Sequence, residues 1–203
     1  MRVLVAGGAG FIGGHISEAL VEAGHQVRVA DNLVTGNLDN LAAIRDVVEI
    51  RRVDLTDPDA AMDAVTGVDA ICHQAAVPSV PRSVRNPLES HAACATTTIN
   101  LLNAARQHSV KRFVYASSSS AYGDGVELPK VESMRPDPRS PYAVAKLAGE
   151  FYVSAFSSCY GLDAISLRYF NIFGPRQDPS SPYSGVIARF STLMSQGKAP
   201  VIY

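Results

Sequence analysis

One segment near the start of the chain indicates the fold: Val3-Leu4-Val5-Ala6-Gly7-Gly8-Ala9-Gly10-Phe11-Ile12-Gly13. An apolar run leads directly into glycines with the spacing G-x-x-G-x-x-G, and a helical pattern follows. A diphosphate can approach a helix N-terminus only where the preceding turn has no side chains in its way, because backbone N–H groups are the donors. We expect Gly7 to form the turn, Gly10 to admit a pyrophosphate and Gly13 to let the helix pack closely on its strand. The alternative is a glycine-rich turn with no ligand.

An acidic residue ends the second predicted strand, where a dinucleotide-binding fold places the group that binds the adenosine ribose. The second predicted strand ends at Asp31, which is 24 residues after Gly7, and Asn32 follows it. A carboxylate at this place accepts hydrogen bonds from an adenosine ribose and repels a 2′-phosphate, so NAD is favoured over NADP. Arg28 is close in the sequence, but the alternation of side chains along a strand places it away from Asp31.

The turn after the third predicted strand, Asp54-Leu55, is the next candidate for contact with the adenine. Asp54 could equally cap the helix that follows, because aspartate is a preferred N-cap residue. The sequence alone leaves both interpretations open.

Short apolar runs alternate with helical patterns along most of the chain. Regular alternation implies right-handed crossovers and a parallel sheet with helices on both faces, that is, a Rossmann-type doubly wound α/β fold. The predicted strands are Val3–Ala6, Val27–Ala30, Val47–Val53, Ala70–His73, Arg112–Ala116 and Ala164–Tyr169, and the predicted helices are Phe11–Ala23, Pro58–Val65, Leu88–Gln107 and Pro141–Tyr160.

The pattern changes near position 171. A stretch rich in turn residues, Ile172–Pro182, precedes a helical pattern over Ser184–Gln196. We therefore expect a nucleotide-binding domain at 1–170 and the beginning of a smaller substrate lobe at 171–203. The final apolar run, Ala199–Tyr203, reads as a strand, so we expect a fragment of a longer chain.

The composition excludes several classes of protein. The chain has 203 residues, 47% of them hydrophobic, and 18 Lys plus Arg stand against 19 Asp plus Glu. A net charge of −1 offers no attraction for a phosphate backbone, so we expect a globular protein that binds no nucleic acid. No run approaches the roughly 20 apolar residues that span a bilayer, so we expect no membrane partner. The three widely spaced cysteines predict neither disulfides nor a metal site and favour a cytoplasmic protein.

Tyr142 and Lys146 lie four residues apart on the clearest predicted helix, so their side chains share one face. A free tyrosine titrates near pH ~10, but an adjacent ammonium and a cationic nicotinamide both favour its phenolate. We therefore expect a lowered Tyr142 pKa and a tyrosine that acts as a general base. The alternative is that this common spacing arose by chance.

A run of hydroxyls follows the fifth predicted strand, at Ser117-Ser118-Ser119-Ser120. Ligands of a doubly wound sheet lie beyond the carboxyl ends of its strands, so these hydroxyls should face the same crevice as the glycine turn. The alternative is a flexible polar loop.

These motifs occur together in the chain order of a known family. The sequence resembles the extended short-chain dehydrogenase/reductases, specifically the NAD-dependent sugar-nucleotide epimerase/dehydratase family, and most of all its UDP-glucose and UDP-N-acetylglucosamine 4-epimerases. The resemblance rests on the glycine turn, Asp31, His73-Gln74-Ala75-Ala76, the serine run before Tyr122-Gly123, the Tyr142/Lys146 pair and Leu167-Arg168-Tyr169-Phe170-Asn171.

The resemblance implies an isomerase that inverts C4 of a UDP-hexose through a transient 4-keto sugar. It implies that Tyr142 removes the 4-hydroxyl proton, Lys146 holds the nicotinamide ribose, and Ser118 and Ser119 bind the sugar O4. Asn171 would contact the substrate diphosphate. The cofactor-binding residues would be Gly7, Gly10, Phe11, Ile12, Gly13, Asp31, Asn32, Asp54, Leu55, Ala75, Ala76, Tyr142, Lys146 and Phe170.

The sequence departs from the family pattern in the helix after the fourth strand. Family members carry an Asn that helps to hold the cofactor and a Gly three residues later, whereas this chain has Cys94 and Thr97. The serine run also bears on the reaction. Dehydratases and the decarboxylase of the family carry an acid beside the catalytic hydroxyl, but Ser119 and Ser120 stand there in this chain, which favours simple C4 inversion.

Two other hypotheses stay open at this point. One is a nucleotide-sugar 4,6-dehydratase or decarboxylase, and the other is a non-catalytic remnant that only binds NAD. The resemblance also implies a homodimer, with a four-helix bundle made from Leu88–Gln107 and Pro141–Tyr160 of two subunits.

Overall fold

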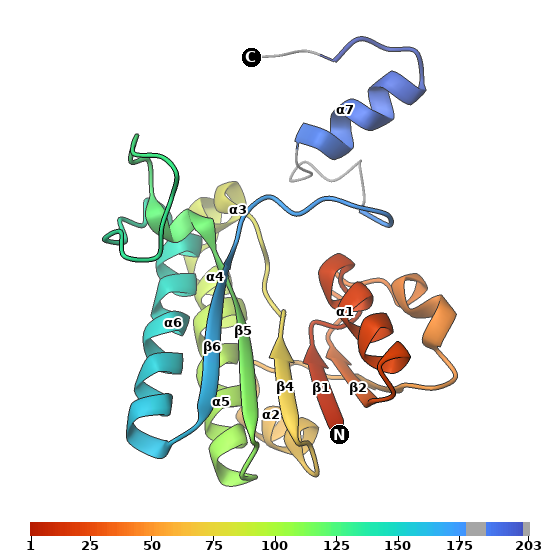
Figure 1. Ribbon diagram of the computed structural model, residues 1–203, viewed down its shortest axis with the longest axis vertical. Helices are drawn as coiled ribbons and strands as arrows, with labels where there is room; N and C mark the ends of the chain where they lie inside the picture. Colours follow the sequence, from red (N-terminus) through yellow and green to blue (C-terminus); the bar gives the residue numbers. More distant parts are fainter. Residues whose placement is uncertain (178–185, 201–203) are drawn as a thin grey trace. The chain divides into compact units, whose positions relative to one another are not determined.

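Six strands form one sheet in the computed structural model, which describes residues 1–177 and 186–200. Their order across the sheet is β3-β2-β1-β4-β5-β6, and β1 pairs in parallel with both β2 and β4 (Figure 1). The β2–β3 and β4–β5 pairs are parallel as well. The predicted doubly wound α/β fold is therefore confirmed. The strands are β1 (Arg2–Ala6), β2 (Gln26–Asp31), β3 (Glu49–Arg52), β4 (Ala70–His73), β5 (Arg112–Ser118) and β6 (Asp163–Tyr169).

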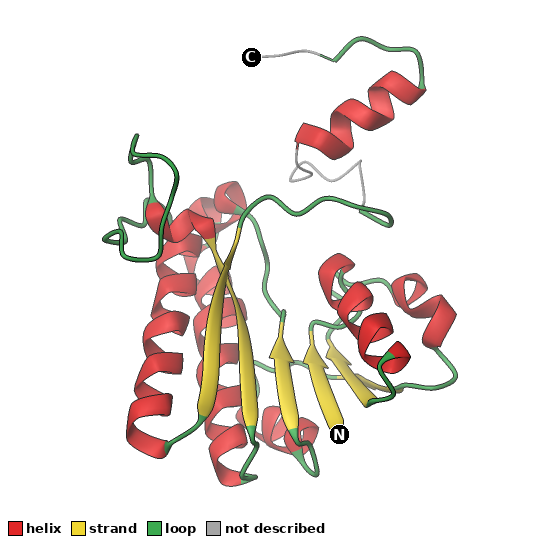
Figure 2. Ribbon diagram, viewed as in Figure 1, coloured by secondary structure: helices red, strands yellow, loops and turns green. Residues whose placement is uncertain are grey.

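Helices lie on both faces of this sheet (Figure 2). They are α1 (Phe11–Glu22), η1 (Leu38–Ile44), α2 (Pro58–Val65), α3 (Val80–Arg85), α4 (Pro87–His91), the π-helical turn η2 (Ala92–Thr96), α5 (Thr97–Gln107), η3 (Ser119–Tyr122), α6 (Pro141–Tyr160) and α7 (Val186–Ser195). The start and end of α6 follow from its sequence. Ser140 Oγ accepts a hydrogen bond from the Ala143 N–H at 3.1 Å, Pro141 opens the helix, and Gly161 ends it with φ +70°.

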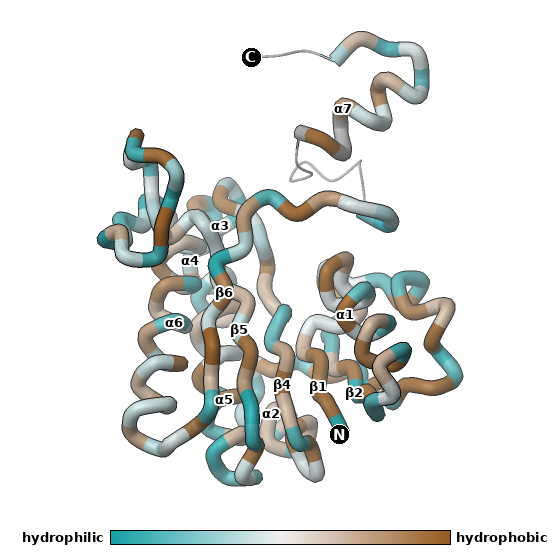
Figure 3. The backbone as a smooth tube through the Cα atoms, in the orientation of Figure 1, coloured by the Kyte–Doolittle hydropathy of each residue, from teal (hydrophilic) through white to brown (hydrophobic). Residues whose placement is uncertain are grey.

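Each face of the sheet has its own apolar core. One joins β1, β4 and β5 to α2, α5 and α6 through side chains such as Leu4, Ile71, Leu101 and Phe113. The other joins β1 and β2 to η1 through side chains such as Val29 and Leu41, with residues of α1 packed against it. Figure 3 shows the apolar character of β1, which contributes to both cores. This burial on two faces explains why its strand pattern is continuously apolar.

Three predicted elements differ from the structure by more than one residue. The predicted strand Arg112–Ala116 is longer, because β5 continues to Ser118 and so includes the first two residues of the serine run. The predicted strand Val47–Val53 is shorter, because β3 occupies only Glu49–Arg52 and Val47 is exposed. The predicted helix Leu88–Gln107 consists of α4, η2 and α5, because a turn of i→i+5 bonding interrupts it. Residues 178–185 and 201–203 lie outside the described part. Parts of three predictions fall on them, namely the end of the turn-rich stretch at Pro182, the start of the predicted helix at Ser184 and the end of the strand-like run at Tyr203.

The described residues divide into two compact units, Met1–Arg168 and Tyr169–Tyr203. The first contains the sheet with α1–α6, and the second contains α7. Within residues 1–177 and 186–200, no helix has both the length and the apolarity that a membrane span needs.

Candidate active site

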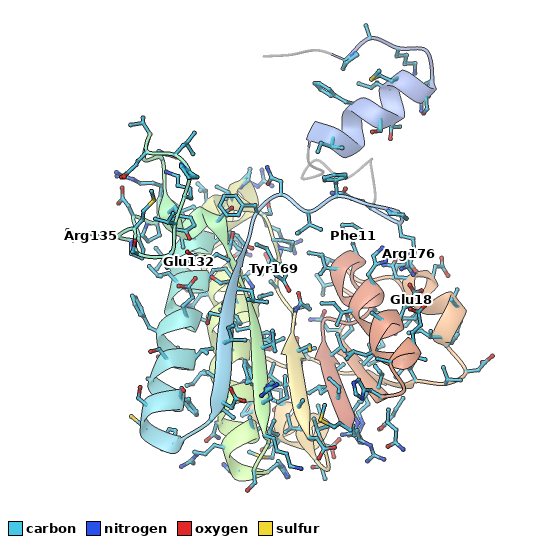
Figure 4. The ribbon with its side chains drawn as sticks, viewed as in Figure 1. Phe11, Glu18, Glu132, Arg135, Tyr169 and Arg176 are labelled. Atoms are coloured by element: carbon cyan, nitrogen blue, oxygen red, sulfur yellow. The ribbon has the colours of Figure 1, made fainter. Side chains whose placement is uncertain are left out.

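The glycine turn joins β1, β4 and α1 through their backbones. Gly7 has φ +76°, and a Cβ built on it would lie 2.6 Å from the Ala75 nitrogen. A Cβ on Gly13 would lie 2.1 Å from the Gly7 carbonyl oxygen. Gly10 is the N-cap of α1 and supplies no side-chain acceptor, so the first turn keeps uncapped N–H groups. Figure 4 labels Phe11, the first residue of this helix. This cradle of backbone donors fits the diphosphate of a dinucleotide.

Asp31 fastens the end of β2 to the glycine turn. Its Oδ2 accepts from the Ala9 N–H at 3.0 Å, and its Oδ1 accepts from the Leu33 N–H at 2.8 Å. Burial raises the pKa of this carboxyl, although the two backbone hydrogen bonds oppose that effect. Gly36 lies against it, since a Cβ at this position would come within 2.7 Å of Asp31 Oδ1. The carboxylate is thereby fixed next to the turn, where a ribose would bind.

Arg28 is fully engaged on the α2 side of the sheet. Its Nε donates to Glu49 Oε2 at 2.8 Å, and its Nη1 donates to the carbonyls of Ala64 and Thr66 at 2.7 and 2.8 Å. A guanidinium held in this way does not offer itself to a 2′-phosphate, so the geometry fits NAD rather than NADP.

Asp54 forms a local turn and does not cap α2. Its Oδ1 accepts from the Thr56 N–H at 3.0 Å and from the Thr56 hydroxyl at 2.8 Å. The cap of α2 is Asp57, so the capping interpretation of Asp54 is wrong. A hydrogen bond from Asn32 contributes to a lowered Asp54 pKa, which shows that these two side chains meet where β2 and β3 end.

Three further residues predicted to contact the cofactor are Leu55, Ala75 and Ala76, whose side chains are buried or small. The Leu55 side chain is buried in the core, and its carbonyl accepts from Asn100 Nδ2 at 3.1 Å. Ala75 lies against Gly7, and Ala76 packs against the cluster that includes Tyr142.

The structure brings Ser118 and Tyr142 together. Ser118 ends β5, and its Oγ accepts from both the N–H and the hydroxyl of Ser120, at 3.2 and 2.8 Å. Because both contacts use Ser118 as the acceptor, its own hydrogen is available to Tyr142, whose pKa this hydrogen bond lowers. Burial nevertheless raises the Tyr142 pKa to about 12, with a smaller contribution from Cys94. The expected lowering is therefore not found in the chain by itself, because desolvation dominates.

Lys146 is buried on α6, one turn after Tyr142. Its Nζ donates to the Ala116 carbonyl at 2.8 Å and lies 5.1 Å from the centre of the Tyr115 ring. Burial lowers the pKa of this ammonium. An ammonium has three donors, so it can still reach a ligand after bonding Ala116.

Cys94 occupies the π-helical turn η2, and its side chain is fully buried. It clusters with Ala95 and Ala145, and Ala76 and Tyr142 pack against them. A thiol therefore lines the site where family members place an amide, and the nearby Thr97 donates its hydroxyl to a backbone carbonyl of the same turn.

The remaining predicted residues are described by their elements. Ser119 begins η3 directly after Ser118, and Ile12 is the second residue of α1. Phe170 and Asn171 belong to the second unit and are exposed there.

The structure shows a network beside Ser118 that the sequence motifs do not predict. Glu150 on α6 bonds both Arg168 on β6 and Ser117 on β5. One signal was present, because Glu150 follows Lys146 by four residues and so shares its helix face.

Comparison with known proteins agrees with this geometry. The model of the NAD dependent epimerase/dehydratase family matches residues 3–203. The chain is 38% identical to a UDP-glucose 4-epimerase of Mycolicibacterium smegmatis, covering 100% of this chain and 66% of that protein. It is also 38% identical to a dTDP-glucose 4,6-dehydratase of Streptomyces niveus, with 100% and 62% covered.

A solved structure is similar over the whole chain. It is the UDP-N-acetylglucosamine 4-epimerase of Methanobrevibacter ruminantium M1, with a TM-score of 0.93, 40% identity, and 100% of this chain and 65% of that one covered. The chain thus spans just under two thirds of the length of these three proteins. With the glycine turn, Asp31 and the Ser118–Tyr142–Lys146 group in place, this chain belongs to the NAD dependent epimerase/dehydratase family.

Proposed function

We propose that the protein inverts the configuration at C4 of a UDP-hexose, either UDP-glucose and UDP-galactose or their N-acetylated counterparts. The observation that carries this proposal is the hydrogen bond between Ser118 and Tyr142 at the carboxyl end of β5, where the Lys146 ammonium bonds the Ala116 carbonyl of the same strand. These groups are connected through the sheet to a glycine turn that fits NAD, as the family requires.

The roles of the residues follow from their chemistry. NAD, when bound, supplies the reversible acceptor for the hydride of C4. Tyr142 takes the proton of the 4-hydroxyl, while Ser118, assisted by Ser119, donates a hydrogen bond to O4 and holds it there. Lys146 binds the nicotinamide ribose. The 4-keto sugar then presents its other face, and Tyr142 returns the proton to O4 as the hydride comes back.

Inversion is favoured over water elimination because Ser119 and Ser120 follow Ser118. Both are hydroxyl residues at the start of η3, and neither is an acid that could protonate a leaving hydroxide at neutral pH.

We further propose that residues 171–203 begin the substrate lobe, in which Asn171 contacts the substrate diphosphate. Phe170, just before this lobe, packs beside the nicotinamide. The free thiols of Cys72, Cys94 and Cys159 fit a cytoplasmic protein.

The test is a panel of four substrates incubated with the NAD-loaded, full-length protein: UDP-glucose, UDP-galactose and their N-acetylated forms. Chromatography should show conversion of at least one sugar into its C4 epimer, with no net consumption of NAD. Accumulation of a stable 4-keto or pentose product would establish the dehydratase or decarboxylase alternative. Retention of NAD without conversion of any sugar would indicate a remnant that only binds the cofactor.

Replacing Asp31 with asparagine should weaken NAD binding by about tenfold or more, because hydrogen bonds to a carboxylate contribute about 1.5–3 kcal/mol. Binding by the unchanged protein should also weaken on acidification. The raised pKa of Asp31 means that this loss begins at a higher pH than for an ordinary aspartate, since protonation removes an acceptor.

Calorimetric titration with NAD measures the affinity of the variant and its dependence on pH. Calorimetry is chosen because the chain has no tryptophan whose fluorescence could report binding. Asp46→Asn is the matched control, because Asp46 is exposed beyond η1. Equal NAD affinity in the Asp31→Asn and Asp46→Asn variants at neutral pH would contradict the role of Asp31.

We also propose that two copies associate through a four-helix bundle that includes α6. Val144 and Phe151 are seven residues apart on this helix and both are exposed, Phe151 to 64%, and Leu88 of α4 is exposed as well. Phe151→Arg should therefore produce a monomer in analytical ultracentrifugation. Val47→Arg changes an exposed apolar residue beside β3 and should leave the dimer intact. A wild-type protein that sediments only as a monomer would refute the proposal.

A further inference from the structure

A partly buried ion pair lies beside the proposed catalytic centre. Arg168 on β6 donates twice to the Glu150 carboxylate on α6, from Nε to Oε1 and from Nη2 to Oε2, each at 2.9 Å. The side chains of Arg168 and Glu150 are only 16% and 13% exposed. Two parallel bonds between planar groups fix both their distance and their orientation.

Two further contacts connect this pair to the segment that carries Ser118. Ser117, the residue before it, donates its hydroxyl to Glu150 Oε1. The Arg168 guanidinium lies over the Tyr122 ring, with Cζ 4.5 Å from the ring centre. Since Ser117 precedes Ser118 and Tyr122 ends the turn η3 after it, the ion pair holds this segment on both sides.

The same pair also holds the helix that carries the base. Tyr142, Lys146 and Glu150 follow one another at intervals of four residues, so they lie along one face of α6. When Glu150 is fixed against β5 and β6, the rotation of α6 and its height above the sheet are fixed as well. Tyr142 then meets Ser118 at a defined place.

We propose that the Glu150–Arg168 pair, with Ser117 and Tyr122, is a positioning device that sets Ser118 Oγ against Tyr142 Oη. This inference rests on the proposed function of these two residues. Stability alone does not account for this partly buried pair, because even a fully buried ion pair can often be replaced by apolar side chains with no loss of stability. Its contribution is geometric, and a displacement of about 1 Å at a reacting group can cost a hundredfold in rate.

The test compares Glu150→Gln, Arg168→Lys and Ser117→Ala in the full-length, NAD-loaded protein. Glu150→Gln and Arg168→Lys should lower kcat about tenfold, with KM changed less than about twofold, because the misplacement affects the reacting groups and not the binding of the sugar. Ser117→Ala keeps the ion pair and should have a smaller effect in the same direction.

The pH dependence of kcat gives a sharper readout. In Glu150→Gln the acidic limb should move to higher pH by about half a unit, because Tyr142 loses the hydrogen bond that favours its phenolate. Direct electrostatics gives the opposite sign, because removal of a nearby negative charge makes ionisation of a tyrosine easier.

An exposed ion pair between β5 and β6 provides the control. Arg112 and Asp163 join the opposite ends of β5 and β6, and their side chains are 66% and 61% exposed. Asp163→Asn should leave both kcat and its pH profile unchanged.

A titration that does not require turnover separates this inference from the proposed function. The absorbance of tyrosinate, measured against a Tyr142→Phe reference with NAD bound, reports the ionisation of Tyr142 directly. This ionisation should occur at higher pH in Glu150→Gln and Arg168→Lys than in the wild type.

An unchanged Tyr142 titration and kcat, together with a lower Tm, would make the pair purely structural and overturn the inference. If the two ion-pair variants do not fold, the same two readouts on Ser117→Ala decide. A wild type without turnover would refute the epimerase, yet the titration would still test the device.

Discussion

Replacing Tyr142 with phenylalanine should lower kcat for epimerisation about a thousandfold, because general base catalysis typically contributes 10²–10⁴ in rate. The ring, and with it the packing against Cys94, Ala95 and Ala145, is retained. Only the hydroxyl that bonds Ser118 is lost. NAD affinity and Tm should therefore stay close to those of the wild type, which distinguishes a lost base from a damaged site.

Tyr152→Phe is the matched control, because Tyr152 lies on the same helix and is exposed. It should leave kcat unchanged. Chromatographic rates for both variants, measured at saturating substrate, provide the comparison. Turnover of Tyr142→Phe at the wild-type rate would show that another group takes the proton.

The raised pKa of Tyr142 explains why this residue needs partners. At a pKa of about 12, the phenolate is a minor species at neutral pH. The positive charge of a bound oxidised nicotinamide and the hydrogen bond from Ser118 both favour the phenolate. Occupation of the cofactor site should therefore activate the base, so that little proton transfer takes place in its absence.

The arrangement of the sheet was predictable because its signals are local. Each strand is a short apolar run and each crossover carries its own helix pattern, so element order alone leads to a parallel doubly wound sheet. Element ends were less predictable. Val47 has the residue type of a strand but lies exposed outside β3, and apolar spacing does not reveal that η2 adds one residue to its turn.

The site divides in the same way between local and long-range features. The shared helix face of Tyr142 and Lys146 follows from their spacing. The direction of the Tyr142 pKa does not, because it depends on burial among residues about 50 positions earlier, around Cys94. The contacts of Glu150 with Ser117 and Arg168 also join residues far apart in the chain, so no periodicity predicts them.

Replacing Gly13 with alanine should destabilise the fold and abolish measurable NAD binding. The new Cβ would lie 2.1 Å from the Gly7 carbonyl oxygen and 2.8 Å from the Gly8 Cα. Both atoms are backbone, so no rotamer change relieves the clash and α1 must move away from the turn. We expect the free energy of unfolding to fall by about 3 kcal/mol, as for severe overpacking, and NAD affinity to fall at least about a hundredfold.

Variants at two other glycines distinguish a loss of stability from a loss of NAD binding. At Gly10 a Cβ would meet only the Gly7 oxygen, at 3.2 Å, so Gly10→Ala should keep a Tm near that of the wild type. It should nevertheless weaken NAD binding, because the methyl group stands where the pyrophosphate approaches α1. Gly125→Ala, whose Cβ would face only the end of the Lys130 side chain, should change neither property. Thermal melts of the three variants measure the Tm, and calorimetric titrations measure the affinity for NAD. If Gly10→Ala binds NAD as tightly as Gly125→Ala does, the glycine turn closes the helix onto its strand without holding the diphosphate.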